Sequence, residues 1–267
     1  MNKDKNQPRK GLNSLEESYF AALSLKVEKA QQKEFKQEIK ENLNIALKEL
    51  KQKGAIKEIS VYSHKKAAEK HGDFPLWDYI VLIQLKDKQT EADLLPKLRT
   101  LKLSFVPEII RMELLVTTPN STYPIPGEGA KKRRIKPFYA VEYVDVKKNY
   151  LDEFRQIMVE KNGPAMRYIM EQAKWCHNFY ALETVEVYYH NPQYPTWNQV
   201  HVIGLYPEAV IRYKRDFSMG LKLAKQISFI ENFARLKEIR IMRYKSIGGK
   251  LTINRYLGDS SHNITPK

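Results

Sequence analysis

Tyr19-Phe20-Ala21 and Phe138-Tyr139-Ala140 begin two stretches of the chain that can be laid over each other at a spacing of 119 residues. Phe35 matches Phe154 at the same spacing. Further matches follow at spacings that drift from 119 to 130: Val61-Tyr62-Ser63-His64 with Val187-Tyr188-Tyr189-His190, Pro75-Leu76-Trp77-Asp78 with Pro195-Thr196-Trp197-Asn198, and Glu108-Ile109 with Glu238-Ile239. Insertions in loops shift the register in this way while the elements keep their order, so the sequence predicts one fold present twice.

The first copy has the pattern strand, helix, strand, strand, helix, strand. Apolar residues at steps of three and four predict a helix from Phe35 to Leu50, and Gly54 is suited to end it. A second helix is expected over 91–104, and strands are expected over 19–27, 56–62, 77–85 and 109–116.

The second copy repeats this order with two differences. Asn162-Gly163-Pro164 predicts that its first helix is broken or offset and resumes at Pro164. Its second helical region, 207–236, holds about ten residues that the first copy lacks. The chain therefore divides into a disordered N-terminus (1–17), a first unit (18–117), a basic Pro/Gly linker (118–137), a second unit (138–246) and a C-terminal tail (247–267) that pairs at a sheet edge or frays.

A βαββαβ unit is a four-stranded antiparallel sheet with both helices on one face. The third predicted strand is substantially apolar on both sides in each copy. Val81 and Ile83 alternate with Ile80 and Leu82 in the first, and Trp197, Gln199, His201 and Ile203 lie opposite Val200 and Val202 in the second. Both faces of each sheet therefore need burial. The fold class expected is α+β, with two tandem ferredoxin-like units whose sheets pack into a pseudo-dimeric barrel.

With this architecture the chain resembles the dimeric α+β barrel superfamily. The stretch from Phe154 through Asn162-Gly163-Pro164-Ala165-Met166 to Glu183-Thr184 resembles the NIPSNAP/EthD-type branch. The resemblance covers the second half well and the first half only by pattern. It implies a range of activities, which includes cofactor-independent monooxygenases, haem-handling enzymes, sugar mutarotases, cyclases and lyases, and also proteins without known activity. The fold does not choose among them.

The space between the two sheets is the expected ligand cavity. Glu142 and His201, on the first and third strands of the second copy, are the candidate catalytic acid and base, and they replace Leu23 and Val81 of the first copy. The candidate substrate-binding residues are Tyr188, His190, Trp197 and Gln199. A purely structural alternative stays open, in which His201 is a core histidine, Glu142 faces solvent, and the repeated Trp77 and Trp197 plug the barrel.

Other motifs favour no further chemistry. Cys176 and His177 are adjacent and therefore point apart, and no second histidine follows three or four residues later, so no metal site is expected. Dinucleotide and P-loop glycine patterns are missing, and no cofactor is expected. A single cysteine excludes an internal disulfide and favours the cytoplasm, and no apolar run is long enough to span a membrane.

The chain carries a formal net charge of +15, with its densest basic cluster at Lys131-Lys132-Arg133-Arg134-Ile135-Lys136. Three hypotheses follow. The leading one is a protein that binds or transforms a small organic molecule without metal, as an oxidoreductase or an isomerase or lyase if it is an enzyme. The second is a binder of nucleic acid or another polyanion through the basic cluster, which is not favoured. The third is a non-catalytic structural protein with a filled barrel. We expect a monomer, as a pseudo-dimer in one chain, or a further homo-oligomer.

Overall fold

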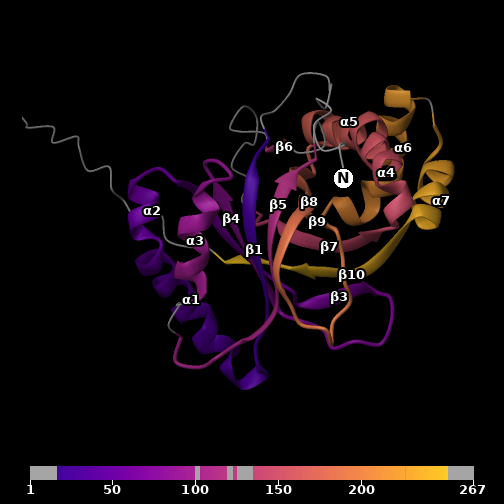
Figure 1. The fold of residues 1–267 in the computed structure, drawn as a ribbon. Helices are drawn as coiled ribbons and strands as arrows, with labels where there is room; N and C mark the ends of the chain where they lie inside the picture. The colour runs from indigo at the N-terminus through magenta and orange to yellow at the C-terminus, as the bar shows by residue number, and fades with distance from the viewer. Residues whose placement is uncertain (1–16, 100–102, 119–122, 125–134, 226, 252–267) are drawn as a thin grey trace, which may run out of the picture.

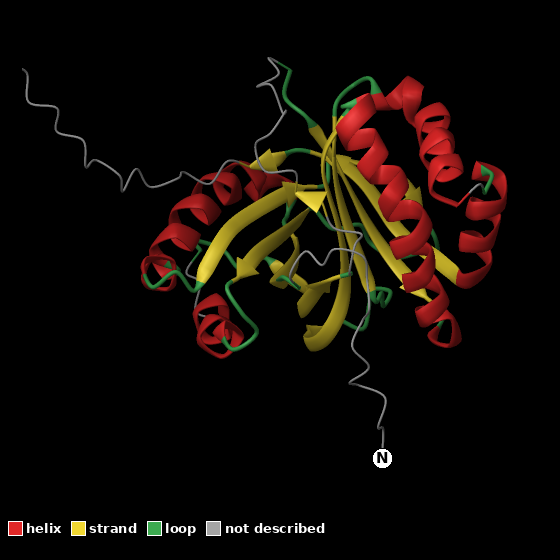
Figure 2. Cartoon of the chain, turned by 90° about the horizontal axis from the view of Figure 1, so that it is seen from above, coloured by secondary structure: helices red, strands yellow, loops and turns green. Residues whose placement is uncertain are grey.

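The computed structural model describes residues 17–99, 103–118, 123–124, 135–225 and 227–251. Its strands form one antiparallel sheet that curves into a barrel, and helices cover the outer side of the barrel at two places (Figures 1 and 2). This is the α+β barrel of two ferredoxin-like units that the repeat predicts. The disorder predicted for the N-terminus and the cluster at 131–134 fall outside the described residues. In the described part of the chain, no helix is both long enough and apolar enough to span a lipid bilayer.

The first unit has the sheet order β2-β4-β1-β5. Its helices lie on the outer side of this sheet, and Phe35, Ile39 and Leu43 are fully buried there. The elements are β1 (Tyr19–Lys26), η1 (Lys29–Gln31), α1 (Gln32–Ala46), α2 (Lys48–Gln52), β2 (Ile56–Ser63), β4 (Tyr79–Leu85), α3 (Thr90–Arg99) and β5 (Glu108–Thr117).

The second unit has the equivalent order β8-β9-β7-β10. Of the two outcomes predicted at Asn162-Gly163-Pro164, the offset is confirmed and the break is wrong, because the helix continues through a π-helical turn and is α-helical again from Gly163. Pro164 lies in the first turn of α5, where its missing N–H costs little, and the wider turn absorbs the change of register. The elements are β7 (Phe138–Val146), η2 (Lys148–Tyr150), α4 (Leu151–Ile157), η3 (Met158–Asn162), α5 (Gly163–Tyr168), η4 (Ile169–Ala173), β8 (Cys176–His190), β9 (Gln199–Leu205), α6 (Ala209–Lys225), α7 (Phe229–Ile239) and β10 (Arg240–Gly248).

Two seams join the units into a closed barrel. At one seam β5 pairs with the second half of β8. At the other, β3 (Lys66–Lys70), which continues β2, pairs with β10, and β11 (Lys250–Leu251) pairs with β2. A Cβ atom on Gly248 would lie 1.5 Å from the carbonyl oxygen of Ser63, so only glycine permits this approach. The described part of the C-terminal tail therefore pairs at the edge of the sheet, which was one of the two outcomes expected from the sequence. The short β6 (Tyr123–Pro124) pairs with β8.

The strand pairing corrects two of the sequence matches. Strands β2 and β3 correspond to β8 at a spacing of 120 residues, so the match of His64 with His190 at 126 is not a structural equivalence. The match of Glu108-Ile109 with Glu238-Ile239 is also wrong, since the first pair begins β5 and the second ends α7. Both errors come from short similar segments that lie next to insertions.

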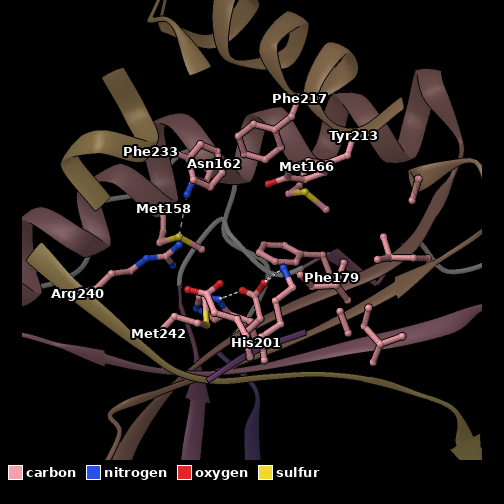
Figure 3. Close-up of a pocket in the computed structure, with 18 of the residues that line it drawn as sticks. Met158, Asn162, Met166, Phe179, His201, Tyr213, Phe217, Phe233, Arg240 and Met242 are labelled. Atoms are coloured by element: carbon pink, nitrogen blue, oxygen red, sulfur yellow. Dashed lines mark hydrogen bonds and ion pairs between the residues drawn. The ribbon is translucent and has the colours of Figure 1, made fainter. Parts of the chain in front are cut away.

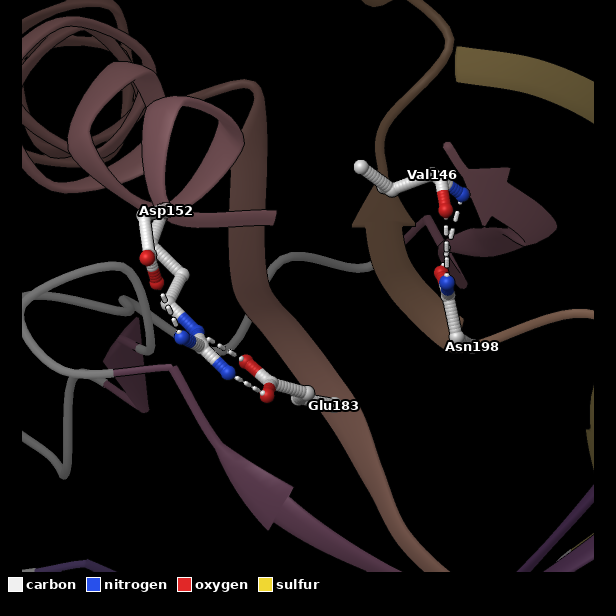
Figure 4. Close-up of polar contacts among 5 residues, drawn as sticks. Val146, Asp152, Glu183 and Asn198 are labelled. Atoms are coloured by element: carbon white, nitrogen blue, oxygen red, sulfur yellow. Dashed lines mark hydrogen bonds and ion pairs between the residues drawn. The ribbon is translucent and has the colours of Figure 1, made fainter. Parts of the chain in front are cut away.

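The Pro-x-Trp match, in contrast, is confirmed by equivalent contacts. Asn198 binds the backbone N–H and carbonyl of Val146 at 2.9 and 2.8 Å and so fixes the end of β7 (Figure 4). In the first unit, Asp78 accepts a hydrogen bond from the N–H of Val27 at 2.9 Å, at the end of β1. The same loop thus anchors the same strand in both units.

Candidate functional site

The interior of the barrel is filled by side chains from both units. Trp77 and Trp197 stack with ring centroids 5.3 Å apart, and Tyr143 and Tyr244 pack around them. Glu113 is buried beside them, where Trp197 donates to one carboxylate oxygen at 2.7 Å. Around these rings the two inner faces bury each other as an aromatic core, and the cavity of ligand size described next does not lie between the sheets, where it was expected.

A cavity of about 610 Å³ lies instead on the other side of the second sheet, between its outer face and the helices. This volume is within the range of small-molecule sites. The floor of the cavity consists of β7, β9 and β10 (Figure 3). Its roof consists of η3 and α5, which belong to the first helical stretch of the second unit, together with α6 and α7. Roof side chains are mostly apolar and include Met158, Met166, Phe217 and Phe233.

The floor carries a row of polar side chains across three adjacent strands. His201 pairs with Glu142 between β9 and β7, and Glu142 pairs with Lys245 between β7 and β10. Nδ1 of His201 lies 3.3 Å from Oε2 of Glu142, and Nζ of Lys245 lies 2.7 Å from Oε1. All three side chains line the cavity. The structure thus brings together the two predicted acid/base residues and adds a lysine.

The first unit has apolar residues at the same three positions. Leu23 pairs with Val81 on one side and with Met112 on the other, and all three belong to the core under α1 and α3. The predicted replacement of Leu23 and Val81 by Glu142 and His201 therefore corresponds to the sheet register. One row forms core in the first unit and the floor of a cavity in the second.

The charge state of the row follows from its neighbours. Burial alone would raise the pKa of Glu142, but Lys245, the hydrogen bond with His201 and the charge of Arg240 outweigh it and hold this pKa well below its ordinary value. Burial lowers the pKa of His201, and Glu142 opposes this only in part. At neutral pH we therefore expect an ionised Glu142 and a neutral imidazole that donates from Nδ1. Its Nε2 is covered by protein and has no hydrogen-bond partner among the described residues.

The roof is held close to the sheet by its own packing. The amide of Asn162, in the π-helical turn η3, donates to Sδ of Met158 at 3.4 Å and accepts from Asn232 of α7 at 2.8 Å. A Cβ atom on Gly220 of α6 would lie 2.7 Å from Cα of Ala165, so α6 and α5 touch at this glycine. π-helical turns often occur at functional sites.

The four predicted substrate-binding residues lie outside this cavity. Trp197 belongs to the barrel core. Gln199 is fully buried on β9, Tyr188 packs against the core of the first unit, and Nε2 of His190 bonds the carbonyl of Tyr194 at 3.2 Å. Period-two alternation placed Gln199 and His201 on one face correctly, but Trp197 precedes β9 and turns to the opposite side.

Sequence reasoning missed Lys245, Arg240 and Tyr213, which also line the cavity. A correct alignment of the last strand of each unit would have placed Lys245 beside Glu142. A bulge between Met242 and Tyr244 shifts the register of β10. This shift conceals that Lys245 is equivalent to Met112 of the first unit. Arg240 and Tyr213 carried no sequence signal, because they come from the boundary of α7 with β10 and from the lengthened helical region.

Among the residues that the structure describes, no group of three or more histidine, cysteine, aspartate or glutamate side chains is arranged to hold a metal ion. Cys176 is a buried free thiol, and burial raises its pKa. Nε2 of the neighbouring His177 lies 3.1 Å from the hydroxyl of Tyr139. Cys176 and His177 therefore do not converge on one site.

No protein-family model matches the chain, and no curated protein does. Among solved structures, it is similar to a tryptophan variant of chlorite dismutase from Candidatus Nitrospira defluvii in complex with cyanide, at 8% identity and a TM-score of 0.48, over 88% of this chain and 91% of that one. Chlorite dismutase from the same organism in complex with imidazole is 9% identical with a TM-score of 0.46, over 88% of this chain and 91% of that one. A further chlorite dismutase candidate is 10% identical with a TM-score of 0.44, over 89% of this chain and 96% of that one. Likeness at this level carries no argument about activity, and the NIPSNAP/EthD assignment stays a resemblance.

Proposed function

We propose that this protein binds a small, partly apolar organic molecule in the cavity of its second unit. The observation that carries this proposal is the contrast between the two outer faces. An ion pair and a histidine line a cavity in one unit, whereas the other unit has only apolar residues at the same positions. Burial of charge is costly, so a sheet that served only as a core would do better with the apolar row.

The floor also supports a proton-transfer role for Glu142 and His201, which remains part of the proposal. Glu142 is a weak base because its pKa is held low, and it fixes the imidazole as the Nδ1–H tautomer. Nε2 of His201 then carries the lone pair that would accept a proton. This nitrogen lies under protein, and so the ligand would have to displace neighbouring side chains to reach it.

His201 is not placed to hold a haem. An iron porphyrin needs an axial ligand atom, often from an imidazole. Nδ1 of His201 is bound to Glu142 and its Nε2 is covered. The role proposed for His201 is therefore proton transfer and not iron ligation.

The test is a ligand screen by thermal unfolding with a matched pair of variants. Ala209 lines the cavity, so Ala209→Phe should fill part of it and abolish the stabilisation given by any ligand that binds there. Ile211, an exposed residue on the same helix that does not line the cavity, provides the control Ile211→Phe. Ligands that stabilise the Ala209→Phe variant as strongly as the wild type would contradict this site.

Polyanion binding remains the second prediction. Most of its basic cluster lies outside the described residues, so the structure adds nothing to it. An affinity for nucleic acid that falls steeply as salt increases would support it.

A further inference from the structure

Arg240 differs from the other arginines whose side chains are described. Each of the others makes an ion pair with a carboxylate: Arg111 with Glu113, Arg155 with Glu183 and Asp152, Arg167 with Glu171, Arg212 and Arg215 with Asp216, Arg235 with Glu153 and Glu238, and Arg243 with Asp145. Figure 4 shows one of these pairs, between Glu183 and an arginine of α4. No described carboxylate lies within ion-pair distance of Arg240. An unpaired guanidinium in a confined site is unusual because desolvation of a charge is costly.

The guanidinium of Arg240 reaches from the start of β10 into the cavity (Figure 3). Its central carbon lies 5.8 Å from the centre of the Phe154 ring, which holds one of its faces. The Phe154 ring is also nearly parallel to the imidazole of His201, with ring centroids 6.2 Å apart and an interplanar angle of 7°. The guanidinium therefore has an aromatic neighbour, which supplies no full counter-charge.

Glu142, the anion of the cavity floor, is occupied by other partners. One carboxylate oxygen accepts from Lys245 and the other from His201. Glu69 is an exposed residue of β3 that lies opposite Lys245 in the strand register and makes no ion pair with Arg240. The charged side chains on the cavity wall are Lys237, Arg240 and Lys245 against Glu69 and Glu142, so cations are in excess.

A second donor faces the same space. Tyr213 extends from α6 into the cavity, and its hydroxyl makes no hydrogen bond to a described residue (Figure 3). Its ring packs against Phe217 and Phe229 of the roof, at centroid distances of 5.4 and 6.0 Å. A guanidinium and a phenolic hydroxyl are both groups that bind an oxyanion.

We propose that the ligand is an organic acid whose carboxylate or phosphate group pairs with Arg240 and accepts a hydrogen bond from Tyr213. Its apolar body then lies under Met166, Phe217 and Phe233. This inference rests on the proposed function and specifies the class of ligand.

The test compares three probes that share one alkyl chain: octanoate, octyl phosphate and 1-octanol, titrated calorimetrically into the full-length protein. We expect at least one of the two anions to bind about ten- to a hundredfold more tightly than the alcohol, the usual range for a charge-assisted contact. The preferred anion distinguishes a carboxylate from a phosphate ligand. The variant Arg240→Gln should lose this preference and bind all three probes alike.

The variant Arg235→Gln is the matched control, because it removes the same charge from an arginine outside the cavity wall. It should keep the preference for the anion, and circular dichroism should show that both variants fold. Equal binding of the alcohol and both anions by the wild type, lost in Ala209→Phe, would overturn this inference and leave the proposed function intact. Anion binding that Arg240→Gln leaves unchanged would also overturn it. Binding of none of the three probes by the wild type would overturn both.

Discussion

The outer faces of the two units are built on the same sheet register and have opposite chemistry. In the first unit, Leu23 and its neighbours across the sheet pack under two helices as ordinary core. In the second, Glu142 occupies the position of Leu23 and lies in an ion pair beneath a cavity. The difference shows that a duplicated scaffold can fill one outer face with core and leave a cavity with a polar floor on the other.

The largest effect should come from introducing the charge of the second unit into the first. Leu23→Glu places a carboxylate among apolar side chains, with no cation in its core cluster, and should cost about 3–5 kcal/mol of unfolding free energy or prevent folding. Urea denaturation measures this, with Leu23→Met as the volume-conserving control. A loss below about 1 kcal/mol would show that the first face tolerates charge and would weaken the comparison.

The reverse exchange should stabilise the protein and remove its site. The variant Glu142→Leu/His201→Val/Lys245→Met reproduces the row of the first unit. Replacement of a buried ion pair by apolar residues is often neutral or stabilising by about 1–4 kcal/mol. The single variant Lys245→Met should instead destabilise, since Glu142 stays buried and loses a partner. If the triple variant were much less stable than the wild type, the polar row would be structural.

Contact between the roof helices should depend on Gly220. Alanine would favour the helix by up to about 1 kcal/mol, but its Cβ would meet the backbone of Ala165 at 2.7 Å. Forced repacking costs about 1–3 kcal/mol, so the net effect of Gly220→Ala should be destabilising. Met219→Ala, at a half-exposed neighbour, is the control. Thermal unfolding of the two variants decides the sign, and equal stability would mean that α6 can move away from α5 freely.

The smallest effect should be a pH dependence that distinguishes the two rows. The pKa of His201 is lowered from its ordinary value of 6.5, so below this pH the unfolded chain gains a proton that the folded protein does not. The pKa of Glu142 is lowered from 4.5, and its contribution is complete above that pH and is lost as pH falls through the lowered value. Both terms reduce stability in acid.

The unfolding free energy of the wild type should therefore fall more between pH 7 and pH 5 than that of the triple variant. Buried His64 lowers stability in acid as well, but it is common to both proteins and its effect cancels. Parallel pH profiles of the two proteins would contradict the assigned charge states.

The repeat in the sequence predicted the barrel and the pairing of Glu142 with His201, because strand periodicity and loop motifs survive duplication. The location of the cavity was not predictable in the same way. Both faces of the third strand are apolar in the first copy, and in the second copy Gln199 and His201 interrupt one face, so the alternation did not show which face would pack solidly. That depends on the ring volumes of Trp77 and Trp197 inside the barrel and on the lengthened α6 and α7 outside it. The distance between a helix and the sheet depends on tertiary packing, and a local sequence pattern does not predict it.

The seam at Gly248 has a consequence for how the polypeptide reaches its native state. Gly249 donates its N–H to the hydroxyl of Ser63, a partner 186 positions earlier in the chain. During synthesis, β2 and β3 emerge long before β10 and β11, and the aromatic inner face of the first sheet stays open to water until those late strands arrive. Contacts of such long range slow folding and leave hydrophobic surface accessible to other chains. We therefore expect the nascent first half to be the stage at which this protein aggregates most readily.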